Sequence, residues 1–235
     1  MSSTDEGIKW YPRVRVARYS AEQTRWAQQI LARQLGWQRA ICTSTGLLVR
    51  TLHGDLLRDL FPLGPEDGYA FDAGNSMVNG GLTNLISLLT GATPSGAAGR
   101  PLTLGAGGAA AGSACVGVGS DGTTGFSATQ THLANATGEG ALNSFYQSMD
   151  SGYPTLTTPA QINGQSTFQP TDANFDWLEW CWASGAGVPT PGPVLASVYA
   201  TAGSAAMLNR KIPPSGLGSK KAGAAWVFQT TVNFS

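Results

Sequence analysis

Residues 225–234 read AWVFQTTVNF, and this stretch decides the fold class. On an extended strand, side chains alternate between two faces, so every second residue shares a face. One face carries Trp226, Phe228, Thr230, Val232 and Phe234, while the residues between them form a mixed second face. An aromatic face opposite a mixed face is typical of a strand that covers a core on one side. The stretch therefore predicts a β-strand near the end of the chain.

Further strand-like runs lie upstream, separated by clusters of Gly, Pro, Asn and Asp. They cover residues 114–118, 143–149, 165–169, 175–182, 194–200 and 206–212. Short strands at such spacing are typical of an all-β sandwich, so we assign residues 113–235 to an antiparallel β-sandwich domain. In residues 175–182 the large side chains fall on both faces, which predicts a central strand that is buried on two sides.

The preceding residues predict an arm and a few helices. Residues 1–19 include a run in which Arg13, Arg15 and Arg18 alternate with small apolar residues, which suits a short extended arm. Ser20 is a predicted N-cap with Gln23 in the capping-box position, and it opens a helix over residues 21–35. Further helices are expected over residues 45–60 and 79–90. We therefore divide this part into an assembly segment, 1–70, and a helix with a Gly/Ala-rich connection, 71–112.

The charge pattern favours a chain that packs among neighbours. Only 12% of the residues are charged, and 14 basic residues balance 14 acidic ones. Free domains carry about a quarter charged residues, and net charge is what keeps copies apart. Residues 1–60 hold nine basic and five acidic residues, residues 61–205 hold one basic and nine acidic, and the last thirty hold four basic and no acidic. We therefore expect a homo-oligomer.

Several partner classes are not expected. The arginines of the lead-in are few, so we expect them to face an acidic protein surface or water rather than nucleic acid. Cys42, Cys115 and Cys181 are far apart and odd in number, which predicts reduced, buried thiols. His53 and His132 have no ligand-spaced partner, so no metal is expected. No signal segment and no apolar run of membrane-spanning length is present in the sequence.

No motif predicts a cofactor or an active site. Residues 117–122 match GxGxxG, but the following residues read as a loop, and the dinucleotide fingerprint needs a helix there. Asp176 and Glu179 are the one carboxylate pair that resembles a glycosidase pair. Three residues apart on a strand, they point to opposite faces, so we expect them to cap a strand end or to pair with Arg210 or Lys211.

The aromatic residues of the C-terminal half have two possible roles. Burial in the sandwich core or in a subunit interface is the commoner fate of clustered aromatics, and an exposed platform for sugar binding is the alternative. The candidates for the core or interface are Phe175, Trp177, Trp180, Trp182, Trp226 and Phe228.

Several short motifs, in order, resemble structural proteins of tailed bacteriophages. They are Cys115–Ser120, Ala128–Leu133, Ala173–Trp180, Met207–Ile212 and Leu217–Lys221 followed by Trp226–Ser235. The resemblance covers about residues 75–235. The sequence departs from the family pattern at Gln130, where the family usually has Asp, and at a Pro/Gly-rich insertion, Val188–Val194.

The resemblance implies a virion structural protein with a β-sandwich body, made in the bacterial cytoplasm and partnered by other virion proteins. A head-associated role, as a minor capsid or decoration subunit, is our first expectation. A tail or baseplate subunit, or a receptor-binding module with exposed tryptophans, is the alternative. The residues expected to dock onto a neighbour are Trp10, Tyr11, Arg13, Arg15, Arg18, Arg25 and Trp26.

Overall fold

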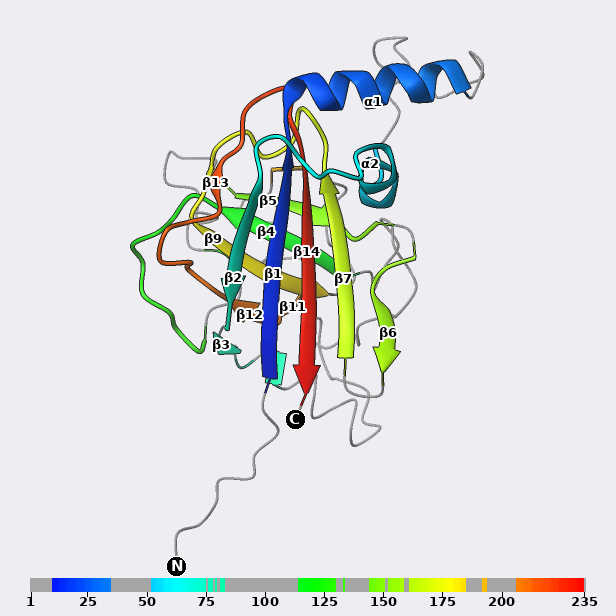
Figure 1. The fold of residues 1–235 in the computed structure, drawn as a ribbon. Coiled ribbons are helices and arrows are strands. Elements are labelled where there is room, and N and C mark those ends of the chain that lie inside the picture. The colour runs from blue at the N-terminus through cyan, green and yellow to red at the C-terminus, as the bar shows by residue number, and fades with distance from the viewer. Residues whose placement is uncertain are drawn as a thin grey trace, which may run out of the picture.

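The computed structural model shows a mainly β protein built from two antiparallel five-stranded sheets (Figure 1). It describes residues 10–34, 52–74, 76–77, 79, 81–82, 114–129, 133, 144–150, 152–158, 161–184, 192–193 and 206–234. The two sheets face each other, and the strands of the second cross behind those of the first (Figure 1). The predicted antiparallel β-sandwich is confirmed.

The first sheet contains both ends of the described chain. Its strands, in spatial order, are β2 (Tyr69–Ala73), β1 (Trp10–Tyr19), β14 (Ala225–Phe234), β7 (Gln161–Phe168) and β6 (Thr155–Thr158). β1 pairs with β14 over its whole length, from Trp10 opposite Phe234 to Tyr19 opposite Ala225. β14 has the bounds that its alternating sequence predicts.

The second sheet supplies the other half of the core. Its strands, in spatial order, are β10 (Gly192–Pro193), β5 (Ser144–Ser148), β4 (Ala114–Gly119), β9 (Glu179–Ser184) and β11 (Ala206–Met207). Trp180 and Trp182 of β9 enter the core between the sheets, while Cys181 and Ala183 are buried on the opposite face. The prediction that this segment is buried on two sides is confirmed.

The predicted strand 175–182 is interrupted at Leu178, where the chain changes partners. Before it, β8 (Asp176–Trp177) pairs with β13 (Gly218–Ser219). At the break, the Leu178 N–H donates to the Gly119 carbonyl at 2.8 Å, and β9 then pairs with β4. A second short ladder joins β12 (Asn209–Arg210) to β3 (Ser76–Met77).

Two helices cover one end of the first sheet (Figure 1). α1 (Ala21–Gln34) begins at the predicted capping box, in which the Gln23 N–H donates to Ser20 Oγ at 3.1 Å and the Ser20 N–H donates to Gln23 Oε1 at 3.3 Å. α2 (Gly54–Leu60) lies within the predicted helix 45–60, but the described residues Leu52 and His53 are not helical, because His53 is the N-cap and its side chain accepts from the Asp55 N–H. Their apolar contacts with the sheet include Ala27, Leu57 and Val227.

The predicted arm is part of the sheet. Residues 10–19 are extended, as expected, but β1 lies between β14 and β2, so both of its edges are hydrogen-bonded within the chain. The predicted boundary at residue 70 also falls inside β2. The structure therefore joins residues of the expected assembly segment and of the expected sandwich domain in one sheet.

Some sequence predictions concern residues outside the described ranges. Asn79, Gly81 and Leu82 are helical, but the rest of the predicted helix 79–90 lies outside them. The same holds for the greater part of the connection 71–112, for the predicted strand 194–200, and for Cys42 and His132.

Candidate functional site: the open part of the five-stranded sheet

The outer face of the first sheet is covered at one end and open at the other. Along β1, Ala17 and Tyr19 are buried beneath the helices, whereas Tyr11, Arg13 and Arg15 on the same face are exposed. β14 repeats the change, because Ala225 and Val227 are buried and the outward positions from Gln229 onward are partly exposed. The open half is therefore a polar sheet surface bounded by α2.

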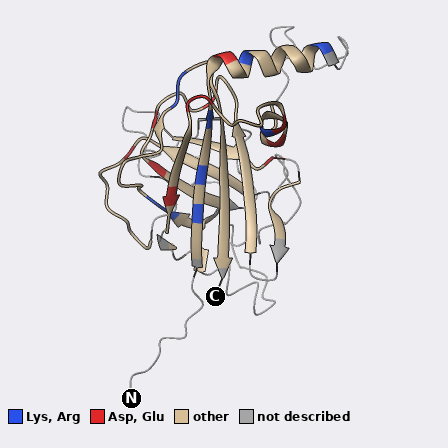
Figure 2. Ribbon diagram, in the orientation of Figure 1, with Lys and Arg blue, Asp and Glu red and all other residues tan. Residues whose placement is uncertain are grey.

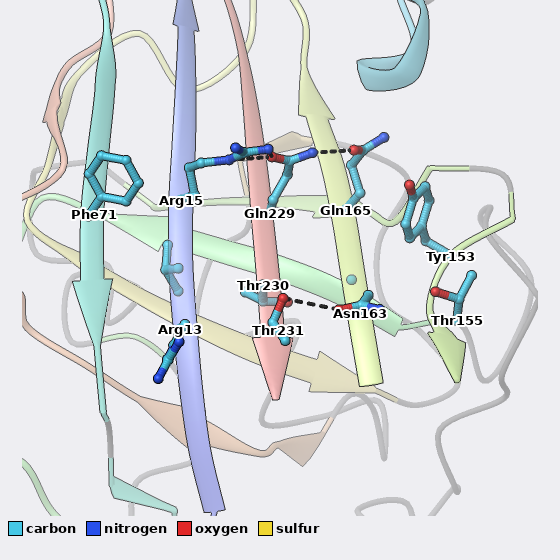
Figure 3. A pocket seen from close by; sticks show the side chains of 12 residues that line it. Arg13, Arg15, Phe71, Tyr153, Thr155, Asn163, Gln165, Gln229, Thr230 and Thr231 are labelled. Atoms are coloured by element: carbon cyan, nitrogen blue, oxygen red, sulfur yellow. Dashed lines mark hydrogen bonds between the residues drawn. The ribbon is translucent and has the colours of Figure 1, made fainter. Parts of the chain in front are cut away.

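This open surface is hollowed. A cavity of about 430 Å³, which we call the sheet hollow, lies across β2, β1, β14, β7 and the segment leading to β6. Phe71 stands at one side and Tyr153 and Thr155 at the other, with the polar floor between them (Figure 3). The lining residues are Arg13, Val14, Arg15, Phe71, Tyr153, Thr155, Asn163, Gly164, Gln165, Gln229, Thr230 and Thr231.

A row of hydrogen bonds fixes the floor of the sheet hollow (Figure 3). Arg15 donates to Gln229 Oε1 through Nε at 2.9 Å and through Nη2 at 2.6 Å. Gln229 Nε2 then donates to Gln165 Oε1 at 2.8 Å. These residues are direct neighbours across β1, β14 and β7, so the register of the strands builds the row. The guanidinium of Arg15 is thereby held in one orientation.

The row ends in a carboxylate network that anchors α2. Gln165 Nε2 donates to Asp150 Oδ2 at 3.0 Å and to Asp55 Oδ1 at 3.3 Å. Asp150 also accepts from the Gly54 N–H and from the Thr167 hydroxyl. Because these donors occupy the Asp150 carboxylate, its role is to hold the helix on the sheet.

Tyr153 closes the sheet hollow beside this network. Its hydroxyl donates to Asp55 Oδ1 at 3.2 Å. Burial and the neighbouring Asp55 carboxylate raise the pKa of Tyr153 above its ordinary value of 10.0. The phenol therefore stays protonated at neutral pH and presents its ring to the cavity without a charge.

The sheet hollow is positively charged. Among the described residues, Arg13 and Arg15 are its charged lining residues, and no carboxylate lines it. Figure 2 shows the basic residues gathered along β1, beside β14 and β7, which are uncharged. The Arg13 guanidinium makes no hydrogen bond or ion pair with the part of the chain that the structure describes. A ligand with a negative charge and an apolar portion would match this lining.

Five of the seven predicted docking residues lie on two exposed surfaces. Tyr11, which is 51% exposed, lies on the open sheet face with Arg13 and Arg15. Trp26 and Arg25 are exposed on α1, where the Trp26 ring packs 5.4 Å from that of Phe61.

The other two predicted docking residues are Arg18 and Trp10. Arg18 is half-buried, with its guanidinium 5.9 Å from the centre of the Trp226 ring. Trp10 begins β1, and its side chain lies outside the described ones.

The predicted core aromatics are in the core. Five of them are almost completely buried, and Phe175 is partly buried against them. Ring centroids lie 4.9 Å apart between Trp177 and Trp226 and 5.6 Å apart between Trp180 and Phe228. Trp177, Trp180 and Trp182 are at most 1% exposed, so they cannot form the exposed sugar platform that the sequence left open.

Asp176 and Glu179, the two carboxylates that resembled a glycosidase pair, lie in different environments, one exposed and one buried. Glu179 is completely buried, and its Oε2 pairs with Arg210 Nε at 2.6 Å, which confirms one of the predicted partners. Arg210 Nη1 also donates to the carbonyls of Thr124 and Gly125. Asp176 is exposed on β8. The buried pair therefore ties β12 to β9 and to the loop after β4.

The first two glycines of the GxGxxG match, Gly117 and Gly119, serve packing. A Cβ on Gly117 would lie 2.5 Å from the Tyr146 ring and 2.7 Å from Cys181 Sγ, and one on Gly119 would meet the Glu179 carboxylate. The chain then turns at Asp121, whose Oδ1 accepts from the N–H groups of Thr123 and Thr124. The segment that follows is a loop, as predicted, and offers no helix N-terminus to a pyrophosphate.

Lys220 was missed by the sequence reasoning. It is 1% exposed, and its Nζ donates to the carbonyls of Gln169 and Asp172 and to Asn174 Oδ1 at 2.8–2.9 Å. Burial lowers its pKa to about 8, against the opposing effect of Asp172. The ammonium group thus fastens the turn before β8 to the segment before β14.

The described ranges contain no cluster of metal ligands and no helix suited to cross a membrane. There, no three His, Cys, Asp or Glu side chains gather closely enough to hold a metal ion. The helices described are also too short or too polar to cross a membrane. Cys115 and Cys181 are buried free thiols, as the sequence predicts.

Comparison of the chain with protein-family models, curated proteins and solved structures finds no match.

Proposed function

We propose that the chain is a structural subunit of a tailed-phage particle, with a head-associated position as a minor capsid or decoration protein. The observation that carries the proposal is where the phage-like motifs lie in the fold. Residues of these motifs form the ties that join the strands, namely the Glu179–Arg210 ion pair, the Asn209 side chain that accepts from the Trp182 N–H at 2.8 Å, and the cage around Lys220.

This placement supports a shared framework rather than a shared active site. The motif residues that form these ties are buried and hold one another in position inside the protein, whereas most residues that line the exposed sheet hollow lie outside the motifs. A framework of this kind leaves the surface free to adapt to different neighbours. The resemblance does not distinguish between stations on the particle, so a tail or baseplate position is the second candidate.

Immunogold electron microscopy tests the proposal. Particles from a culture that carries the gene are purified on a density gradient and labelled with an antibody against the purified chain. Gold on the capsid supports the head-associated position, and gold on the tail or baseplate supports the second candidate. Unlabelled particles, together with an antibody signal confined to the soluble lysate, would overturn both.

A further inference from the structure

We propose that copies of this chain associate head to tail, with the acidic corner of one copy bound in the sheet hollow of the next. We define the acidic corner as four residues: Asp59 in the last turn of α2, and Leu63, Glu66 and Asp67 in the turn that follows the helix. This contact does not depend on where in a particle the chain would sit.

The acidic corner matches the sheet hollow in charge. Asp59 has 73% of its side chain exposed, and Glu66 and Asp67 are exposed as well. Arg58 pairs with Asp55 at 3.1 Å and with Asp59 of the corner at 3.7 Å, so one arginine is shared between two carboxylates and the corner keeps an excess of negative charge. The sheet hollow offers Arg13 and Arg15, and its lining includes no carboxylate from the part of the chain that the structure describes.

The two surfaces also match in their apolar parts. Leu63 is completely exposed at the tip of the turn, beside three carboxylates, and so offers an apolar side chain for contact. The sheet hollow is flanked by Phe71, which is 69% exposed, and by Tyr153. Interface centres are enriched in aromatic residues and arginine and depleted in lysine and carboxylates, as this lining is.

Both surfaces are held in shape before any contact. The turn is closed by hydrogen bonds from the Gly64 N–H to the Phe61 carbonyl at 2.8 Å and from the Asp67 N–H to the Arg18 carbonyl at 3.2 Å. The Glu66 N–H donates to Gln23 Oε1 at 2.9 Å, which attaches the corner to α1. Arg15 is fixed by Gln229. Little conformational freedom is therefore lost on association.

A second copy is favoured over an unrelated partner because one chain carries both halves. The corner and the hollow share no residue, so each copy can use both at once. Such a contact is heterologous, and it produces a closed ring or an open filament. The low net charge of the chain leaves little general repulsion to oppose it.

Charge reversal tests the contact by light scattering behind a sizing column, over a range of concentrations of the full chain. We expect wild-type chain to associate, and the variants R13E/R15E and D59K/E66K/D67K each to raise the dissociation constant by at least about tenfold. Mixing the two variants restores complementary charge at both surfaces, so the mixture is expected to associate again. R25E/R33E, which reverses two exposed arginines of α1, is the matched control and is expected to associate as wild type.

The outcomes are distinct. Far-UV circular dichroism and the urea midpoint establish that each variant is folded, and Leu63→Ser provides a variant without a charge change that should also weaken association. A wild-type chain that stays monomeric, variants that associate as wild type, or a mixture that fails to associate would each overturn the head-to-tail contact. Because particle labelling does not depend on these results, a monomeric chain found on particles would overturn this contact alone.

Discussion

Replacement of Glu179 by Gln removes a buried negative charge while it keeps the shape of the side chain. Glu179 and Arg210 are 0% and 2% exposed, and their contact of 2.6 Å is shielded from solvent. The substitution leaves the guanidinium with the carbonyls of Thr124 and Gly125 but without its counter-charge. Breaking a buried pair from one side costs about 3–5 kcal/mol, so we expect the free energy of unfolding to fall by about that amount.

Urea denaturation followed by tryptophan fluorescence measures this loss, because the core tryptophans become exposed on unfolding. Arg58→Ala is the matched control: it breaks the exposed Asp55–Arg58 pair at 3.1 Å and is expected to cost less than about 1 kcal/mol. E179M/R210M removes both charges. We expect its loss of unfolding free energy to be smaller than the sum of the losses of the single variants E179M and R210M. If E179Q lies within about 1 kcal/mol of wild type, or if the single losses simply add, the reasoning is refuted.

Three further predictions concern the other buried groups. Lys220→Met leaves three acceptors without their donor and should cost about 3 kcal/mol in urea. Because burial lowers the pKa of Lys220 from 10.5 to about 8, unfolded chains bind this proton more than folded chains do between those pH values. Wild type should therefore gain stability relative to K220M as the pH rises through this range, and a stability difference that stays constant with pH would count against the buried ammonium. Burial raises the pKa of Cys115 from 9.0 to about 12, so between these pH values folded chains keep a proton that unfolded chains lose, and the stability of wild type falls as the pH rises. Cys115→Ala should therefore lose less stability than wild type between pH 9 and 12, and equal losses would contradict the burial of this thiol. Gly117→Ala forces a Cβ against Tyr146 and should cost about 1–3 kcal/mol by thermal unfolding, whereas Gly125→Ala, with no atom near its Cβ, should be close to neutral; equal effects would contradict the packing argument.

Local patterns in the sequence predicted the local structure well. The alternation in residues 225–234 predicted β14, and the Ser20–Gln23 pair predicted the start of α1. These signals work because strand periodicity and helix capping involve residues that are neighbours in sequence. The aromatic residues of residues 175–182 were likewise expected in the core, although burial in a core and exposure on a binding surface use the same residue types.

Long-range pairing could not be read in the same way. Residues 10–19 were interpreted as a docking arm because arginines alternate with small apolar residues there. In the structure, that alternation gives β1 one face in the core and one face on the open sheet. The partner strand lies more than 200 residues away, and no local feature of either strand identifies the other.

The sheet hollow was predicted only in part. Arg13 and Arg15 were candidates because they are charged, whereas Gln165, Gln229 and Phe71 were not. A signal for Gln229 was present in the mixed face of residues 225–234, but its meaning depends on which strands lie beside it. Since β14 lies between β1 and β7, the amides of two strands and an arginine of a third form one row.

Quantitative mass spectrometry of gradient-purified particles tests the structural role most directly. We predict that the chain is present in many copies per particle and at a constant ratio to the major particle protein in every fraction of the peak. A chain that is absent from the particles, or whose ratio to the major protein falls as purification proceeds, would contradict the proposed role.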